Sequence, residues 1–159
     1  MKENFLLNTT LAQWLFHECA RDLPVIDYHN HLAIDDLAAD RNYGNIAELW
    51  LLSDPYKHRA MRICGIEEKY ITGETKAIEK FKAWMSVLPR LIGNPLYDWS
   101  IMEMQRVFRI DLKPGITDAQ WLWEQTNSKL AQADYSARKL LSSPFRYVLK
   151  YNFTREKRR

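Results

Sequence analysis

Apolar side chains recur every three or four positions through most of this chain, which is the spacing of amphipathic helices. The clearest case is the segment 72–89, where one helical face carries Ile78, Phe81, Trp84, Met85 and Leu88. A first helix is predicted over 8–23, with one face made of Leu11, Trp14, Leu15 and Cys19. Further helices are predicted over 34–42, 45–52, 53–65, 93–110, 117–132 and 134–143.

Start and stop signals mark several of these helices. Asp54 and Asn94 are capping residues, and each precedes a proline at the first helical position. Gly65 is the expected end of the helix that begins at Pro55. Asn45 is a candidate cap, and Thr117 with Gln120 forms a capping-box pattern.

Only two segments favour strands. Pro24 ends the first helix, and the apolar pair Val25–Ile26 begins a short buried strand at about 24–29. The segment 145–153 is the other extended stretch. A parallel sheet would give the first strand a partner after residue 140, although two strands alone do not make an α/β domain.

Composition narrows the class of protein. The chain has 159 residues, 47% of them hydrophobic, and a net charge of +3 that lies entirely in the last five residues, "REKRR". This charge distribution is unlike a nucleic-acid-binding face, and no apolar run is long enough for a membrane span. Without a leader-like N-terminus, and with two unpatterned cysteines, the chain is expected to be cytoplasmic with reduced thiols.

The candidate chemistry lies at the end of the first strand, in "VIDYHNH". Side chains alternate along a strand, so His29 and His31 would point the same way. Two imidazoles at a strand end are a ready pair of metal ligands, with zinc the expected metal. The alternative is that both histidines are polar loop residues without a ligand.

Several motifs in this order resemble the uronate (glucuronate) isomerase family of the amidohydrolase superfamily. They are "ENFLL", "IDYHNHL", "DPYKHRAMRICGIEEKYITG", "KFKAWMSVLPRLIGNPLYDWSIMEMQRVF" and "LAQADYSARKL". The resemblance implies an α/β fold: the N-terminal part of a metal-dependent-hydrolase-like (β/α)8 barrel. It covers 1–141, with strand 1 at about 24–29 and a helical insertion at about 34–133. The remainder, 142–159, is expected to be a divergent basic tail.

The resemblance also implies roles for individual residues. His29 and His31 would be metal ligands, and Tyr56 matches a tyrosine near the substrate. Many family members carry histidine before that tyrosine, where this chain has Pro55. His58 is expected to be a surface residue. Arg59 and Arg62 could bind a substrate carboxylate, or be ordinary exposed helix charges.

The implied reaction interconverts aldo- and keto-hexuronates, D-glucuronate with D-fructuronate or D-galacturonate with D-tagaturonate, by proton transfer between C2 and C1. The expected cofactor is a divalent metal, zinc, and the expected ligand is a hexuronate sugar acid. Further ligands would come from later strands, so the chain is expected to be truncated and inactive alone. Its partner would be a second copy or a polypeptide carrying the rest of the barrel. The alternatives are a non-catalytic helical interaction module and a metal-dependent hydrolase of the same superfamily.

Overall fold

The computed structural model describes residues 4, 6–23, 25–27, 33–140 and 145–148. For the strand residues 25–27 and 145–148 it describes the backbone and not the side chains. The chain divides into two compact units. The first comprises residues 1–30 and 141–159, and the second comprises residues 31–140. Each unit is described by itself below.

The first unit holds one helical segment and two strands. The α-helix α1 (Thr10–Trp14) is followed without a break by a π-helix, η1 (Leu15–Ala20). Thr9 caps α1 by accepting a hydrogen bond from the backbone N–H of Ala12 at 3.1 Å. The predicted single α-helix over 8–23 is therefore wrong beyond Trp14, because the wider π turn changes which side chains share a face.

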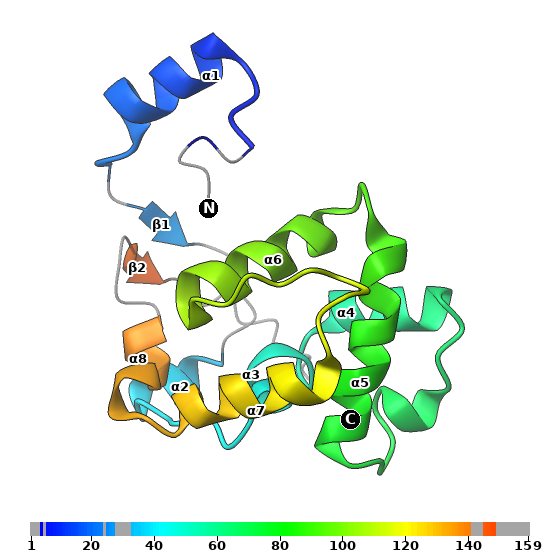
Figure 1. Cartoon of the computed structure of the whole chain (residues 1–159). Helices are drawn as coiled ribbons and strands as arrows, with labels where there is room; N and C mark the ends of the chain where they lie inside the picture. Colours follow the sequence, from blue (N-terminus) through cyan, green and yellow to red (C-terminus); the bar gives the residue numbers. More distant parts are fainter. Residues whose placement is uncertain (1–3, 5, 24, 28–32, 141–144, 149–159) are drawn as a thin grey trace, which may run out of the picture. The chain divides into compact units, whose positions relative to one another are not determined.

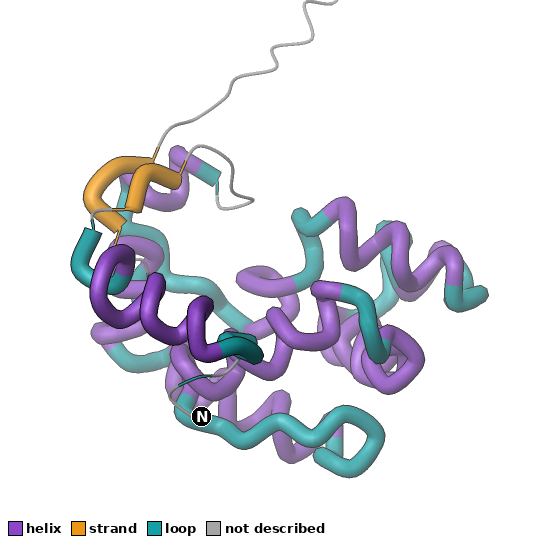
Figure 2. Tube along the Cα trace, turned by 90° about the horizontal axis from the view of Figure 1, so that it is seen from above, coloured by secondary structure: helices purple, strands orange, loops and turns teal. Residues whose placement is uncertain are grey.

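The two strands, β1 (Val25–Asp27) and β2 (Phe145–Val148), pair in parallel. Figures 1 and 2 show them side by side. The register joins Val25 to Phe145 and Asp27 to Val148, with an irregularity after Val25. Parallel strands need a long crossover connection, which residues 28–144 provide. The expectation that the first strand finds its partner after residue 140 is confirmed for these residues.

The second unit is helical (Figure 1). Its α-helices are α2 (Ile34–Ala38), α3 (Ile46–Trp50), α4 (Pro55–Ile63), α5 (Ala77–Val87), α6 (Pro95–Phe108), α7 (Ala119–Leu130) and α8 (Ala137–Leu140). The 3-10 turns are η2 (Glu68–Tyr70), η3 (Leu88–Leu91) and η4 (Ala133–Tyr135). Helix α5 packs against α3, α4 and α7, so it forms the centre of the unit.

The core of this unit is built on the apolar face that the sequence predicts for α5. Phe81 and Trp84 are fully buried. Trp50 of α3 packs edge-on against Trp84, with ring centroids 6.2 Å apart, and Trp123 of α7 lies 5.6 Å from Phe81. Truncating a buried aromatic of this kind to alanine costs about 3–5 kcal/mol.

The ends of the helical unit are joined by hydrogen bonds to one arginine. The Arg138 guanidinium donates to the carbonyls of Leu37 and Ala38, and its backbone N–H donates to Asp40 Oδ1 at 2.9 Å. The backbone N–H of Ala137 also donates to the Arg41 carbonyl at 2.8 Å. These bonds close a segment of about a hundred residues into a loop whose two ends lie next to each other.

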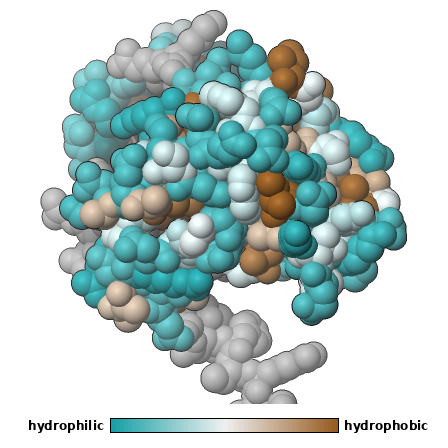
Figure 3. Space-filling model, turned by 60° about the horizontal axis from the view of Figure 1, so that its bottom comes forward, coloured by the Kyte–Doolittle hydropathy of each residue, from teal (hydrophilic) through white to brown (hydrophobic). Residues whose placement is uncertain are grey.

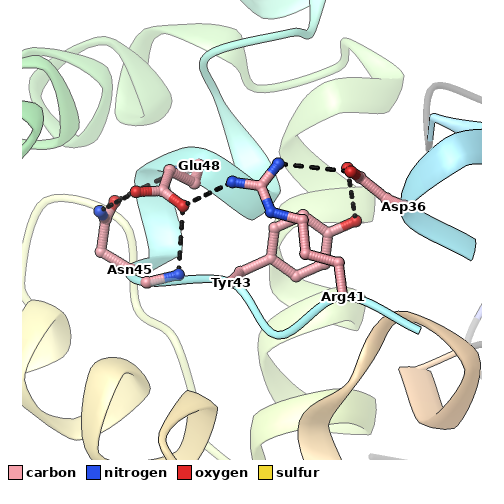
Figure 4. A network of polar contacts seen from close by, with 6 residues as sticks. Asp36, Arg41, Tyr43, Asn45 and Glu48 are labelled. Atoms are coloured by element: carbon pink, nitrogen blue, oxygen red, sulfur yellow. Dashed lines mark hydrogen bonds and ion pairs between the residues drawn. The ribbon is translucent and has the colours of Figure 1, made fainter. Parts of the chain in front are cut away.

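A polar network stabilises the connection between α2 and α3 (Figure 4). Arg41 pairs with Asp36 at 3.3 Å and with Glu48 at 3.2 Å. Tyr43 donates its hydroxyl to Asp36 at 3.3 Å, and Asn45 donates to Glu48 at 2.8 Å. Burial, together with the Asp36 carboxylate, raises the pKa of Tyr43 to about 12. The predicted cap at Asn45 is confirmed, because its side chain accepts from the Glu48 N–H.

In contrast to Asn45, the predicted cap of α7 at Thr117 is wrong. Asp118, not Thr117, caps α7, by accepting a hydrogen bond from the Trp121 N–H at 2.7 Å. Thr117 instead accepts from the Lys113 N–H at 2.9 Å, which holds the preceding turn. Both residues are good caps, and the tertiary course of the turn decided between them.

On the face shown in Figure 3 the surface is mostly hydrophilic, with hydrophobic residues in separate spots. In the part of the chain that the structure describes, no helix combines the length and apolar character needed to cross a lipid bilayer.

Candidate functional site

The two candidate metal ligands, His29 and His31, lie outside the described residues. The described part of β1 ends at Asp27, so the common direction of the two imidazoles stays a prediction. Among the described residues, no group of three or more His, Cys, Asp or Glu side chains could hold a metal ion. Two imidazoles fit zinc in chemistry, but a catalytic zinc site takes three protein ligands. The histidine pair would therefore need at least one further donor.

Helix α4 carries the other candidate residues, and its ends form as the sequence predicts. Asp54 Oδ1 accepts from the backbone N–H groups of Tyr56, at 2.9 Å, and Lys57, at 3.1 Å. Pro55 occupies the first helical position. Gly65 ends the helix with a φ of 80°, a left-handed conformation that favours glycine.

One face of α4 lines a cavity of about 500 Å³. Tyr56, Arg59, Ala60 and Ile63 share this face, since they are three, four and seven positions apart. The opposite wall comes from η3 and the first turns of α6 and consists of Leu91, Asn94, Pro95, Leu96 and Trp99. The structure thus brings Tyr56 and Arg59 to one cavity, where Tyr56 is about half exposed.

Arg62 does not line this cavity. Its guanidinium forms a two-pronged pair with Glu68, with Nε–Oε2 at 2.8 Å and a second nitrogen–oxygen distance of 2.5 Å. Thr72 donates its hydroxyl to the same carboxylate. Hydrogen bonds from Arg62 and then Thr72 lower the pKa of Glu68 to about 2, and the Glu68 carboxylate raises the pKa of Arg62. The two arginines of α4 therefore differ: Arg62 forms an ion pair with Glu68, and Arg59 lines the cavity.

His58 is not the surface residue that the sequence predicts. It is partly buried, and its Nε2 atom is buried without a hydrogen-bond partner among the described residues. Burial is the main cause that lowers its pKa, against a hydrogen bond with the Leu51 backbone. The prediction fails because α4 packs against α5, and this tertiary contact is not indicated by the apolar pattern of α4 alone. Imidazole so placed favours its neutral form.

A buried cation on α4 is the feature that the sequence pattern did not reveal. The Lys57 side chain is 7% exposed, and its ammonium lies 3.2 Å from Asp54 and 4.0 Å from Glu103 of α6. The same ammonium lies 4.9 Å from the ring centre of Trp50, whose indole N–H donates to Glu103. The only local signal is the spacing of Asp54 and Lys57 by three positions. This Lys57 cluster joins α3, α4 and α6 through Trp50, Lys57 and Glu103.

Comparison with known proteins gives one consistent result. A sequence model of the family described as glucuronate isomerase matches residues 1–148, and so extends beyond residue 141. The uronate isomerase of Oceanobacillus iheyensis is 45% identical over 142 residues, which is 89% of this chain and 30% of that protein. The uronate isomerase of Geobacillus stearothermophilus is 45% identical over 139 residues, with 87% and 29% covered.

A solved structure agrees with the sequence matches. The crystal structure of uronate isomerase from Thermotoga maritima superposes with a TM-score of 0.79 at 37% sequence identity. The match covers 89% of this chain and 31% of that one. This chain therefore spans about 30% of the length of the curated relatives it matches.

Proposed function

The chain belongs to the glucuronate isomerase family, and from this premise we propose that it forms the N-terminal part of a hexuronate isomerase. The reaction would interconvert D-glucuronate and D-fructuronate, or D-galacturonate and D-tagaturonate, by moving a proton between C2 and C1. The family match over residues 1–148 is the observation that carries this proposal.

The fold proposed with it is the start of a (β/α)8 barrel, with β1 as the first strand and the helical unit as an insertion. Two observations support this. The strands β1 and β2 are parallel neighbours, as successive barrel strands are. The superposition on the Thermotoga maritima protein covers nearly all of this chain and less than a third of that one.

Isomerisation of an aldose needs a group that transfers the proton, a means of stabilising the enediolate oxyanion, and a clamp for the carboxylate. His29 and His31 would hold a divalent metal, zinc, which when bound polarises the substrate oxygen. Tyr56, which matches a family tyrosine near the substrate, would orient a substrate hydroxyl or relay the proton; it is among the residues that line the α4 cavity. The Arg62 guanidinium already forms an ion pair with Glu68, which argues against Arg62 as the residue that binds the substrate carboxylate.

A barrel of this kind takes about 250 residues before insertions. This sequence offers two histidines toward a metal that needs three or more ligands, and it spans about 30% of the relatives. We therefore propose that the third ligand and the carboxylate clamp come from the part of the relatives' length that these 159 residues do not match. On this view the 159 residues by themselves do not isomerise hexuronates.

A chimera tests the proposal directly. Residues 1–148 of this chain would replace the matching N-terminal segment of the Oceanobacillus iheyensis uronate isomerase, with the 159-residue chain assayed beside it. We expect the chimera to convert D-glucuronate and the 159-residue chain to show no turnover and no tightly held zinc by mass spectrometry. Tyr56→Phe in the chimera should lower kcat by about a hundredfold if the tyrosine relays the proton.

The histidine pair supplies the decisive variant. His29→Ala with His31→Ala should remove both zinc and activity from the chimera, while His17→Ala, a matched control on η1, should change neither. A folded chimera that keeps its zinc and turnover without His29 and His31 would contradict the proposal. A folded chimera without any turnover would favour the alternative, a helical interaction module.

A further inference from the structure

We propose that the cavity between α4, η3 and α6 binds a small carboxylate with an apolar body, whose negative charge pairs with Arg59. The cavity lining includes Tyr56, which the proposed isomerase also uses, but this inference rests on the charge of Arg59 and on the apolar wall rather than on that activity. The cavity volume, about 500 Å³, lies within the range of small-molecule sites, roughly 300–1,000 Å³.

The charge of the cavity selects an anion. Among the described residues that line the cavity, Arg59 is the one that carries a charge, and none is Asp or Glu. Among the residues that the structure describes, the Arg59 guanidinium has no ion-pair or hydrogen-bond partner, whereas Arg62 one turn away is held by Glu68. A planar guanidinium that is not already paired matches the geometry of a carboxylate.

The start of α6 strengthens the preference for negative charge. This helix has 14 residues, and its first residues, Pro95 and Leu96, belong to the cavity wall. The positive end of the helix dipole favours an anion there. Pro95 has no N–H, and the Leu96 N–H already donates to Asn94 Oδ1 at 3.0 Å. The helix therefore contributes its field, and Arg59 provides the hydrogen bonds.

The rest of the lining selects an apolar body. Ala60, Ile63, Leu91, Pro95, Leu96 and Trp99 form most of the wall. Ile63 is 75% exposed and Trp99 is 47% exposed, so a ligand could remove apolar surface of both from water. A hexuronate presents hydroxyls on every side, whereas the polar lining residues beside Arg59 are only Tyr56 and Asn94 among those that the structure describes, and the rest of the wall is apolar. An aromatic ring, in contrast, can stack on the Trp99 indole.

The test uses three probes on the full 159-residue chain. They are phenylacetate, its neutral counterpart phenylacetamide, and D-glucuronate, with affinities measured by ligand-observed NMR titration into the millimolar range. We expect phenylacetate to bind about tenfold or more tightly than phenylacetamide, because only the acid makes charge-assisted hydrogen bonds. D-glucuronate should bind more weakly than phenylacetate. Raising the salt concentration should weaken phenylacetate binding alone.

Variants separate the charge from the apolar wall. Arg59→Gln should weaken phenylacetate about tenfold and leave phenylacetamide unchanged, whereas Arg62→Gln, the matched control on the same helix, should change neither. Trp99→Ala should weaken both aromatic probes to a similar extent, and far-UV circular dichroism would confirm that each variant is folded.

Three results would overturn the inference. These are absence of phenylacetate binding, equal affinity for acid and amide, and equal losses in the Arg59 and Arg62 variants. Binding of D-glucuronate in preference to phenylacetate would also overturn it and would assign the cavity to the hexuronate instead. None of these results bears on the chimera assay, so the two proposals fail separately. A dimer in light scattering that Arg59→Glu dissociates, without probe binding, would reassign the face to a second copy of the chain.

Discussion

The Lys57 cluster allows a stability prediction in which a charge effect is separated from a capping effect. Asp54 has two functions: one carboxylate oxygen caps α4, and the other lies 3.2 Å from the Lys57 ammonium. Asparagine is as good a helix cap as aspartate, but it carries no charge. Asp54→Asn therefore removes the ion pair and keeps the cap, while Asp54→Ala removes both.

The magnitude follows from what Lys57 keeps. Removing one partner of a buried ion pair costs about 3–5 kcal/mol when the other charge is left alone. Lys57 retains the Glu103 carboxylate at 4.0 Å and the Trp50 ring at 4.9 Å. We therefore expect Asp54→Asn to lower the free energy of unfolding by about 2 kcal/mol, below the range for an uncompensated charge. Asp54→Ala should cost about 1 kcal/mol more, which is the typical value of a cap.

Urea unfolding, followed by far-UV circular dichroism at neutral pH, measures both changes. The double variant Asp54→Asn with Lys57→Met is the informative control, because it removes the charge that Asp54→Asn leaves unpaired. It should be more stable than Asp54→Asn alone. If Asp54→Asn unfolds at the wild-type urea concentration, the ion pair contributes nothing. If the double variant is no more stable than the single one, the cost does not come from the lysine charge.

Other predictions concern pH and backbone strain. Because burial lowers the pKa of His58 below 6.5, the unfolded chain binds more protons there, and stability should fall as pH drops below 6.5; His58→Gln should flatten that decline in a series of urea titrations. The pKa of Glu68 is lowered from an ordinary 4.5 to about 2, so the stability that its ion pair contributes is complete above pH 4.5 and is lost as pH falls toward 2. Arg62→Gln should remove this dependence of Tm on acidic pH in thermal melts. Arg109 ends α6 with a φ of 54°, a left-handed conformation that favours glycine. Arg109→Gly should therefore raise Tm and increase the free energy of unfolding by about 0.5–1 kcal/mol, whereas Arg106→Gly within α6 should lower it by about 1 kcal/mol. A lower Tm for Arg109→Gly would refute the strain argument.

Local signals were sufficient for much of the helical unit. Asp54 with Pro55, and Asn94 with Pro95, start α4 and α6 where the sequence predicts, and Gly65 follows α4 in the left-handed conformation. These signals work because a cap acts on N–H groups two or three residues away. The apolar face of α5 was also predictable, since helical spacing alone places Phe81 and Trp84 together.

The candidate site was predictable only in part. The sequence indicates which residues are chemically able to act, and it places Tyr56 and Arg59 on one helical face. It did not indicate that Glu68 would form an ion pair with Arg62 or that His58 would be partly buried. The ion pair depends on how the turn after α4 places Glu68, and the burial of His58 depends on how α4 packs in the unit; no short-range pattern encodes either contact.

The sequence by itself thus determined the starts of α3, α4 and α6, the central apolar face and the family, because each depends on residues close in the chain or on motifs in order. Only the tertiary structure decided the register in which β1 pairs with β2, the burial of Lys57 against Asp54 and Glu103, and the position of Arg59 at a cavity. These contacts join segments far apart in sequence, and their energies depend on burial, which exists only once the chain has packed.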